Sequence, residues 1–126
     1  MLPGRHRLRS SADFAEVFRG ARRAGGSRSG GRLIVLHANS TDAREGQPPR
    51  VGFVVSKAVG NAVVRNRTKR VLRALMSTRI GALPDGVDVV VRANADLPGA
   101  PRTLLVQDLD RLLATVVRRV TPQEGH

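Results

Sequence analysis

The sequence has no cysteine, tryptophan or tyrosine, and only three phenylalanines. The absence of cysteine excludes disulfides, iron–sulfur clusters, thiol catalysis and zinc sites with cysteine ligands. No apolar run reaches the about 18 residues that a membrane-spanning helix needs. The basic residues 1–11 lack the apolar stretch of a secretory signal. We therefore expect a soluble cytoplasmic protein.

The length of 126 residues and the 40% of hydrophobic residues indicate one folded domain with its own core. We place this single domain at residues 1–121. Residues 122–126 are expected to form a flexible C-terminal tail.

Acidic residues are scarce, and they are unevenly placed. The chain carries 22 Lys and Arg against 10 Asp and Glu, a net charge of +12. Residues 47–84 contain eight basic residues and no acidic one. Such a field implies a polyanionic partner, most often nucleic acid. Of the 22 cations 20 are arginine, a preference that suits phosphate binding, although the base composition of the genome is an equal explanation.

Hydrophobic periodicity and turn residues predict a mixed α/β (α+β) domain in the order α-β-β-β-α-β-α. Residues 24–31 are glycine-rich and are expected to hold at most one short irregular strand. The predicted helices span residues 11–19, 61–79 and 103–120, and the predicted longer strands span residues 32–38, 50–56 and 87–92. The helix between the last two strands predicts that they are parallel, and the general preference of such crossovers predicts a right-handed connection.

The helix predicted at 61–79 has two opposite faces. At 100° per residue, one arc collects apolar side chains that would pack on the sheet. The other arc is basic, with Arg67 on its flank, and no carboxylate lies three or four residues away to relieve the repulsion. An external anion is therefore expected to supply the countercharge. The basic arc consists of Arg65, Asn66, Lys69, Arg70 and Arg73.

The turn before this helix has two interpretations. Lys57, the backbone of Gly60 and the free N–H groups of the helix start form a possible phosphate cradle. A plain loop followed by a helix cap at Asn61 explains the same residues. The spacing of a nucleotide-hydrolysing P-loop is absent.

Two sequence motifs resemble a known family. Residues 56–73 read S-K-x-x-G-N-A-V-x-R-N-R-x-K-R-x-x-R, and residues 8–18 read L-R-x-x-x-D-F-x-x-V-F. Both resemble the bacterial ribonuclease P protein subunit, and the element order matches that family over about residues 5–120. The resemblance implies a ribosomal protein S5 domain 2-like fold, with a mixed sheet of four-stranded type and an unusual left-handed βαβ crossover. On handedness we follow the resemblance rather than the general preference.

The resemblance also implies a function. The protein would bind a catalytic RNA, one copy to one RNA, and help it to recognise precursor tRNA. The holoenzyme would remove the 5′ leader by hydrolysis of one phosphodiester, with chemistry carried by the RNA and Mg²⁺. No catalytic residue and no metal site are therefore expected on the protein.

The resemblance implies two RNA-binding surfaces. The RNA-subunit surface would consist of Lys57, Asn61, Arg65, Asn66, Arg67, Lys69, Arg70 and Arg73. A cleft between the first helix and the sheet would hold the single-stranded leader, through Arg9, Phe14, Phe18, His37 and Arg92. Core packing is an equal explanation for Phe14 and Phe18, and Phe53 is expected in the core.

Other functions remain as alternatives. The main one is a ribosomal-type structural RNA-binding protein without a role in cleavage. A DNA-binding regulator lacks a helix-turn-helix pair, and a membrane-surface protein would need more aromatic residues. A metallonuclease would need acidic ligands, but turns and strand ends explain Asp85, Asp88 and Asp96 more simply. We therefore expect neither DNA nor membrane as a partner.

Overall fold

The computed structural model describes residues 2–23 and 26–120, so the tail predicted at 122–126 lies outside the described residues. The element order confirms the predicted α-β-β-β-α-β-α arrangement. Short 3₁₀ turns lie at Gly4–His6, Asp42–Arg44 and Ile80–Ala82. The main elements are α1 (Ser11–Gly20), β1 (Ser27–Gly30), β2 (Ile34–Ser40), β3 (Arg50–Val54), α2 (Ala62–Ser77), β4 (Val87–Ala93) and α3 (Arg102–Val120).

α1 begins directly after a capping residue. The Ser10 hydroxyl accepts a hydrogen bond from the Asp13 N–H at 3.1 Å, which satisfies one free donor of the first turn of α1. Asp13 does not return the bond to Ser10 as a full capping box would, because its carboxylate lies 3.5 Å from Arg50 instead. Ser10 thus caps α1, and Asp13 makes a tertiary contact with β3.

The sheet has the strand order β1-β2-β4-β3. β2 pairs antiparallel with both β1 and β4, whereas β3 and β4 are parallel, as predicted. The strands β2 and β3 follow each other in sequence and run in opposite directions, but they are not neighbours because β4 lies between them. The connection between them therefore passes the start of β4, where the Gly86 N–H donates to the Gln47 carbonyl, instead of forming a hairpin.

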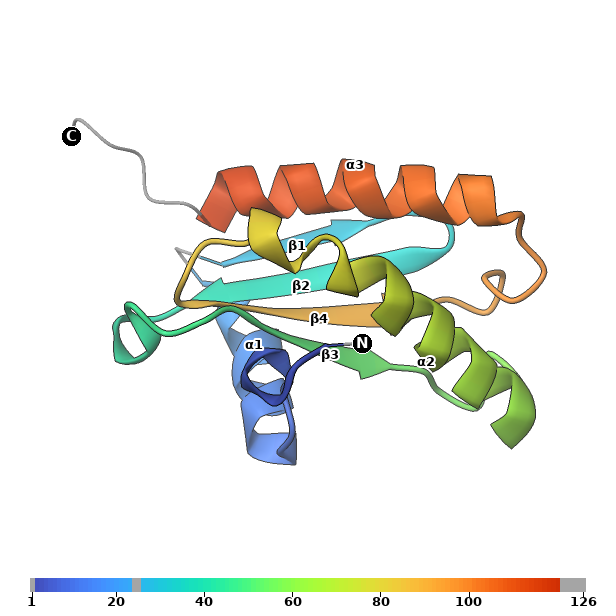
Figure 1. Cartoon of the computed structure of the whole chain (residues 1–126), viewed down its shortest axis with the longest axis horizontal. Coiled ribbons are helices and arrows are strands. Elements are labelled where there is room, and N and C mark those ends of the chain that lie inside the picture. The colour runs from blue at the N-terminus through green and yellow to red at the C-terminus, as the bar shows by residue number, and fades with distance from the viewer. Residues whose placement is uncertain (1, 24–25, 121–126) are drawn as a thin grey trace.

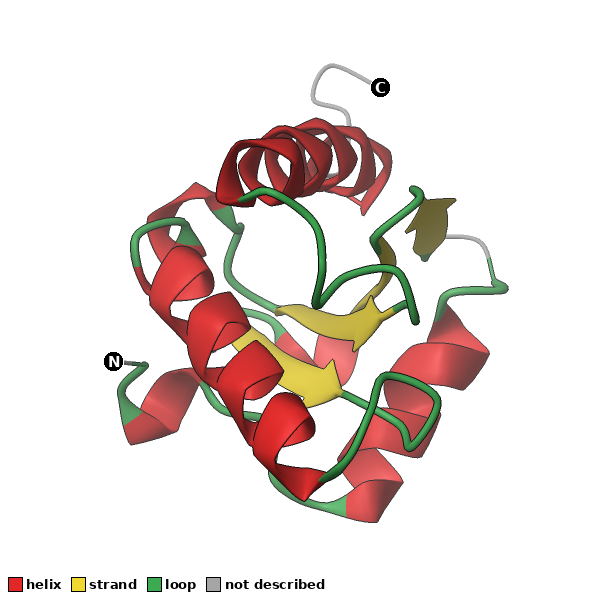
Figure 2. Ribbon diagram, turned by 90° about the vertical axis from the view of Figure 1, so that its right-hand side faces the viewer, coloured by secondary structure: helices red, strands yellow, loops and turns green. Residues whose placement is uncertain are grey.

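The β3-α2-β4 connection is left-handed. In Figure 1, β3 and β4 both run towards the right, β4 lies above β3, and α2 crosses in front of the sheet. The resemblance predicted this hand, and the right-handed expectation from general preference is wrong. With this strand order, a right-handed crossover would place α2 on the face that α1 already covers (Figure 2).

The sheet separates two cores. α2 and α3 cover one face and α1 covers the other (Figure 2). The larger core holds the apolar stripes of α2 and α3, including Leu72 and Leu109, both fully buried, and Phe53 packs against it as predicted. Among the described residues, Leu8, Val17 and Val90 form the smaller core, with Phe14, Phe18 and Val54 packed around them. No helix among the described residues has the length and apolar content to cross a membrane.

Candidate nucleic-acid interface

The start of α2 is fixed by a glycine and a cap. Gly60 has a φ of 154°, and a Cβ atom there would meet the Val64 side chain at 2.9 Å, so a larger residue is strained at this position. The Asn61 side-chain oxygen accepts a hydrogen bond from the Val64 N–H at 3.0 Å. The cap interpretation of Asn61 is therefore confirmed, and Lys57 lies exposed in the turn just before it.

The predicted division of α2 into two faces is present. Thr68, Leu72 and Met76 are buried against the sheet side. Asn66, Arg67, Arg70 and Arg73 are exposed, whereas Arg65 and Lys69 are half-buried. Lys57 and the cations of α2 form no ion pair with any carboxylate among the described residues. The helix thus presents uncompensated positive charge, and the buried Nε of Arg65 has no hydrogen-bond partner within that part of the chain.

Arg79, just beyond α2, forms an ion pair with a carboxylate, unlike the cations of α2. Its guanidinium lies 2.6 Å and 3.3 Å from the two carboxylate oxygens of Asp110 on α3. The hydrogen bond from Arg79 lowers the pKa of Asp110 and raises that of Arg79. Arg79 therefore ties α2 to α3, and the free positive surface ends before it.

A hollow of about 390 Å³ lies between α1, its following turn and the sheet. It brings together three of the residues predicted for the leader cleft, namely Phe18, His37 and Arg92. The rings of Phe18 and His37 meet edge to face, with centroids 4.7 Å apart. The lining is completed by Ala21, Arg22 and Arg28, which were not among the predicted residues. We call this site the α1 hollow.

His37 is an unsatisfied polar group in the α1 hollow. Only 6% of its surface is exposed, and its Nε2 has no hydrogen-bond partner among the described residues. Burial, together with the charges of Arg92, Arg28 and Arg22, lowers the pKa of His37 from 6.5 to about 4. The imidazole is therefore neutral at pH 7 and retains hydrogen-bonding capacity that the protein itself does not use.

Phe14 and Arg9 lie outside the α1 hollow. Phe14 packs over Gly52 of β3, where a Cβ atom would collide with the ring. It lines a second, smaller hollow of about 190 Å³ at the β3 edge. Lys69 and Arg73 of α2 line the same hollow, so the basic helix and the α1 side meet around this edge. Arg9 is exposed, lines neither hollow, and its guanidinium lies beside Gly4.

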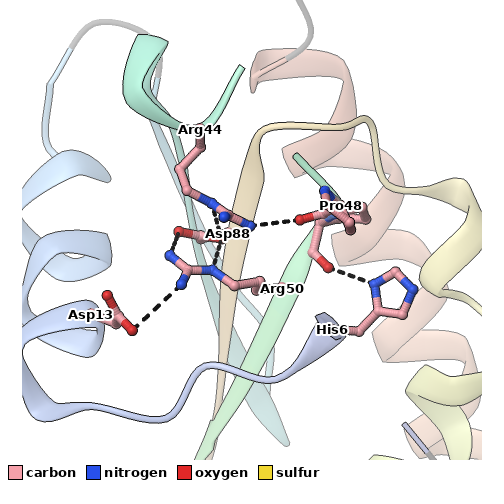
Figure 3. A network of polar contacts seen from close by, with 7 residues as sticks. His6, Asp13, Arg44, Pro48, Arg50 and Asp88 are labelled. Carbon is pink, nitrogen blue, oxygen red and sulfur yellow. Dashed lines mark hydrogen bonds and ion pairs between the residues drawn. The ribbon is translucent and has the colours of Figure 1, made fainter. Parts of the chain in front are cut away.

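A polar network holds α1 against the sheet (Figure 3). Two nitrogens of Arg50 bind the two oxygens of Asp88 at 2.9 Å and 2.8 Å, and a third lies 3.5 Å from Asp13 of α1. The hydrogen bonds that Arg50 donates to Asp88 raise the pKa of Arg50. Arg44 approaches the same Asp88 at 3.8 Å, and the His6 ring contacts the Pro49 carbonyl at 2.7 Å. Both carboxylate oxygens of Asp88 therefore already accept hydrogen bonds from Arg50.

The acidic residues that the structure describes do not form a metal centre. Asp88 is held by Arg50, and Asp96 pairs with Arg32 at 3.6 Å. Across residues 2–23 and 26–120, no group of three or more His, Asp or Glu side chains is placed to hold a metal ion.

The fold and the unpaired cations on its crossover helix define a small basic α+β domain with a positively charged surface on α2. The family model for ribonuclease P matches residues 2–117. The chain is 47% identical over 119 residues to the ribonuclease P protein component of Kocuria rhizophila, covering 94% of this chain and 98% of that protein. The corresponding protein of Beutenbergia cavernae is 50% identical over 116 residues, 92% of each chain.

A solved structure agrees with these relatives. The ribonuclease P protein of Thermotoga maritima superposes with a TM-score of 0.69 at 26% identity, covering 96% of this chain and all of that one. The chain therefore belongs to the ribonuclease P protein family. Its members are the protein components of ribonuclease P, the endoribonuclease of tRNA 5′ maturation. This membership decides against the ribosomal alternative.

Proposed function

We propose that the chain binds the catalytic RNA of ribonuclease P through α2 and the 5′ leader of precursor tRNA through the α1 hollow. The observation that carries the proposal is the outer face of α2, whose cations have no carboxylate partner among the described residues. Like charges on one helix face are mildly destabilising by themselves. A folded RNA supplies the missing anions, and one such helix per chain supports a complex of one protein with one RNA.

The proposed RNA-subunit surface works through phosphate contacts. Each arginine fork can bind two phosphate oxygens, and each neutralised phosphate releases counterions. Affinity is then high at low salt and falls steeply as salt rises. The surface comprises Lys57, Asn61, Arg65, Asn66, Arg67, Lys69, Arg70 and Arg73. Asn61 contributes mainly by capping the start of α2, the helix that carries the arginines.

The proposed leader site works by stacking and charge. The Phe18 ring offers an aromatic surface, and Arg22, Arg28 and Arg92 surround the hollow with positive charge. Stacking of an unpaired base is worth about 1–3 kcal/mol. The free Nε2 of His37 adds a possible hydrogen bond to a base. Arg9 and Phe14 remain part of the proposed leader path as flanking residues, with Phe14 at the β3 edge.

We assign the chemistry to the RNA component. The described carboxylates do not form a donor set for Mg²⁺, so no step is assigned to a metal on the protein. The protein would position the leader and add positive charge where the catalytic RNA and the precursor tRNA meet. Mg²⁺ would bind to the RNA component and take part in its chemistry. Neither DNA nor a membrane is proposed as a partner, and a cytoplasmic location is the natural one for tRNA maturation.

Paired substitutions test the RNA-subunit surface. In the variant Arg65→Ala with Arg67→Ala, the slope of log affinity for the catalytic RNA against log salt should fall by about 1.5, because two phosphate contacts are lost. The matched control, Arg111→Ala with Arg118→Ala on α3, removes the same charge and should leave the slope unchanged. Equal slopes in the two double variants would disprove the assignment.

A holoenzyme assay tests the leader site. Arg92→Ala should weaken binding of precursor tRNA to the reconstituted holoenzyme while leaving affinity for the catalytic RNA alone unchanged. The loss should disappear with a substrate whose leader is cut to one nucleotide. Reconstitution itself should lower the Mg²⁺ concentration needed for cleavage. A loss that persists with the short leader would place Arg92 outside the leader path.

A further inference from the structure

A third hollow lies on the opposite flank of α2, away from the α1 side. It has a volume of about 200 Å³ and is formed by α2, the loop at 94–101 and the start of α3. Its lining is mostly apolar and includes Val71, Leu97 and Leu105. Arg67 of α2 and Arg102 of α3, both exposed, line it as well. We call it the α2–α3 hollow.

The charge of the α2–α3 hollow is uncompensated. No carboxylate lines it, and neither Arg67 nor Arg102 forms an ion pair within residues 2–23 and 26–120. Asp96, the acidic residue of the adjoining loop, is directed to Arg32 instead. Two guanidinium groups beside an apolar hollow repel each other unless an anion lies between them.

The size and chemistry of the hollow suit part of a nucleotide. It is smaller than the roughly 300–1,000 Å³ of pockets that enclose drug-sized ligands. An apolar floor can accept the face of a base or ribose, and arginine both binds phosphate and stacks on bases. Because Arg67 also belongs to the basic surface of α2, an RNA bound along α2 would reach the hollow without leaving the protein.

The walls of the hollow are already in place. The Asn94 side chain donates hydrogen bonds to the carbonyls of Gly31 and Arg32, both at 3.1 Å, which anchors the loop to the β1–β2 connection. On the α2 side, the Thr68 hydroxyl is satisfied by the Val64 carbonyl at 2.8 Å. A preformed site costs little ordering entropy when a ligand enters.

We propose that the α2–α3 hollow holds one unpaired nucleotide of the catalytic RNA, with its phosphate between Arg67 and Arg102. The proposal rests on the proposed function, since it extends the RNA-subunit surface from α2 onto α3. It adds Arg102, which neither the sequence motif nor the outer face of α2 includes, to the residues that contact RNA.

Crosslinking tests this placement directly. The chain has no cysteine, so Pro98→Cys at the hollow can carry a single photo-crosslinker. The control site is Arg118→Cys, sixteen residues beyond Arg102 on α3 and therefore about 24 Å away along the helix. In the reconstituted holoenzyme, the reagent at position 98 should crosslink one short segment of the catalytic RNA, and the reagent at position 118 should not. Equal crosslinking from both sites, or crosslinks to precursor tRNA alone, would overturn the proposal.

A charge-matched pair separates this site from the rest of the surface. Arg102→Ala should weaken affinity for the catalytic RNA by about 5–10-fold near 0.1 M salt and lower the salt slope by nearly one. Arg118→Ala should change neither. If Arg102→Ala matches Arg118→Ala while Arg65→Ala still weakens binding, the hollow is not an RNA contact although the proposed function stands. If none of these variants affects binding, the proposed function fails as well.

Discussion

The two faces of the sheet differ in composition although the same strands supply both. On β4, Val87, Val89 and Val91 point to the face of α2 and α3. The alternating residues Asp88, Val90 and Arg92 point to the face of α1. The first set is apolar and fully buried. The second set contains two charged residues and a single valine of the smaller core.

The difference follows from how much helix covers each face. α2 and α3 have 16 and 19 residues and together bury a continuous apolar layer, whereas α1 has only 10 residues. A ten-residue helix cannot exclude water from a four-stranded sheet, so polar strand residues remain beside open space. The α2 and α3 face supplies most of the apolar core, and the α1 face keeps polar and charged strand residues beside the α1 hollow.

Truncation of one side chain on each face gives the largest expected contrast. Leu72→Ala should lower the free energy of unfolding by about 3 kcal/mol, because Leu72 is fully buried in the larger core. Phe18→Ala, although it removes more atoms, should cost less stability because Phe18 is only half-buried. Urea titration of both variants checks the ranking. A larger stability loss for Phe18→Ala would mean that the α1 face is a core like the other.

The pH dependence of stability distinguishes the faces through His37. Folded His37 binds a proton only near pH 4, whereas the unfolded chain binds it near pH 6.5. Between these values the unfolded state holds more protons on His37. The contribution of His37 to stability therefore falls as pH falls through this window, and it changes no further below it. The loss from His37 should be at most about 3 kcal/mol.

The control for this prediction is His37→Gln, which cannot titrate. Carboxylates titrate in the same window, so the meaningful quantity is the difference between the two pH profiles of unfolding free energy. The profiles should diverge below pH 6.5, with the wild-type chain losing more. Parallel profiles would show that burial and the three arginines do not hold His37 neutral.

Local features of the sequence were sufficient for the helices and the outer face of α2. Ser10 and Asn61 mark helix starts by capping, and the apolar period of α2 places its arginines outwards. These properties depend on neighbours within four residues. The placement of the RNA-subunit residues follows from this period, and their role in binding stays a prediction.

Features that depend on distant pairing could not be predicted locally. β1 lies in a Ser- and Gly-rich segment and is a strand because it pairs with β2, with Arg28 opposite His37. That pairing brings Arg28 to the α1 hollow, and the turn after α1 brings Arg22. Phe14 was grouped with Phe18, but their places differ because Gly52 lets the Phe14 ring lie over β3. The insertion of β4 between β2 and β3 has no local signal.

The smallest expected contrast compares two arginine–aspartate pairs. Asp88→Asn should destabilise the chain by about 2 kcal/mol, because Asp88 is largely buried on the α1 face and Arg50 would lose two charged hydrogen bonds there. Asp110→Asn, which removes the partner of Arg79 on the other side of the molecule, should cost under about 1 kcal/mol, since that carboxylate is half-exposed to water. Thermal or urea unfolding of both variants measures the difference.

Because Arg50 also contacts Asp13, the loss at Asp88 should be accompanied by weaker leader binding, whereas Asp110→Asn should leave it unchanged. If the two variants lose equal stability and bind leader equally, the polar network does not position α1, and the α1 hollow is shaped by packing alone.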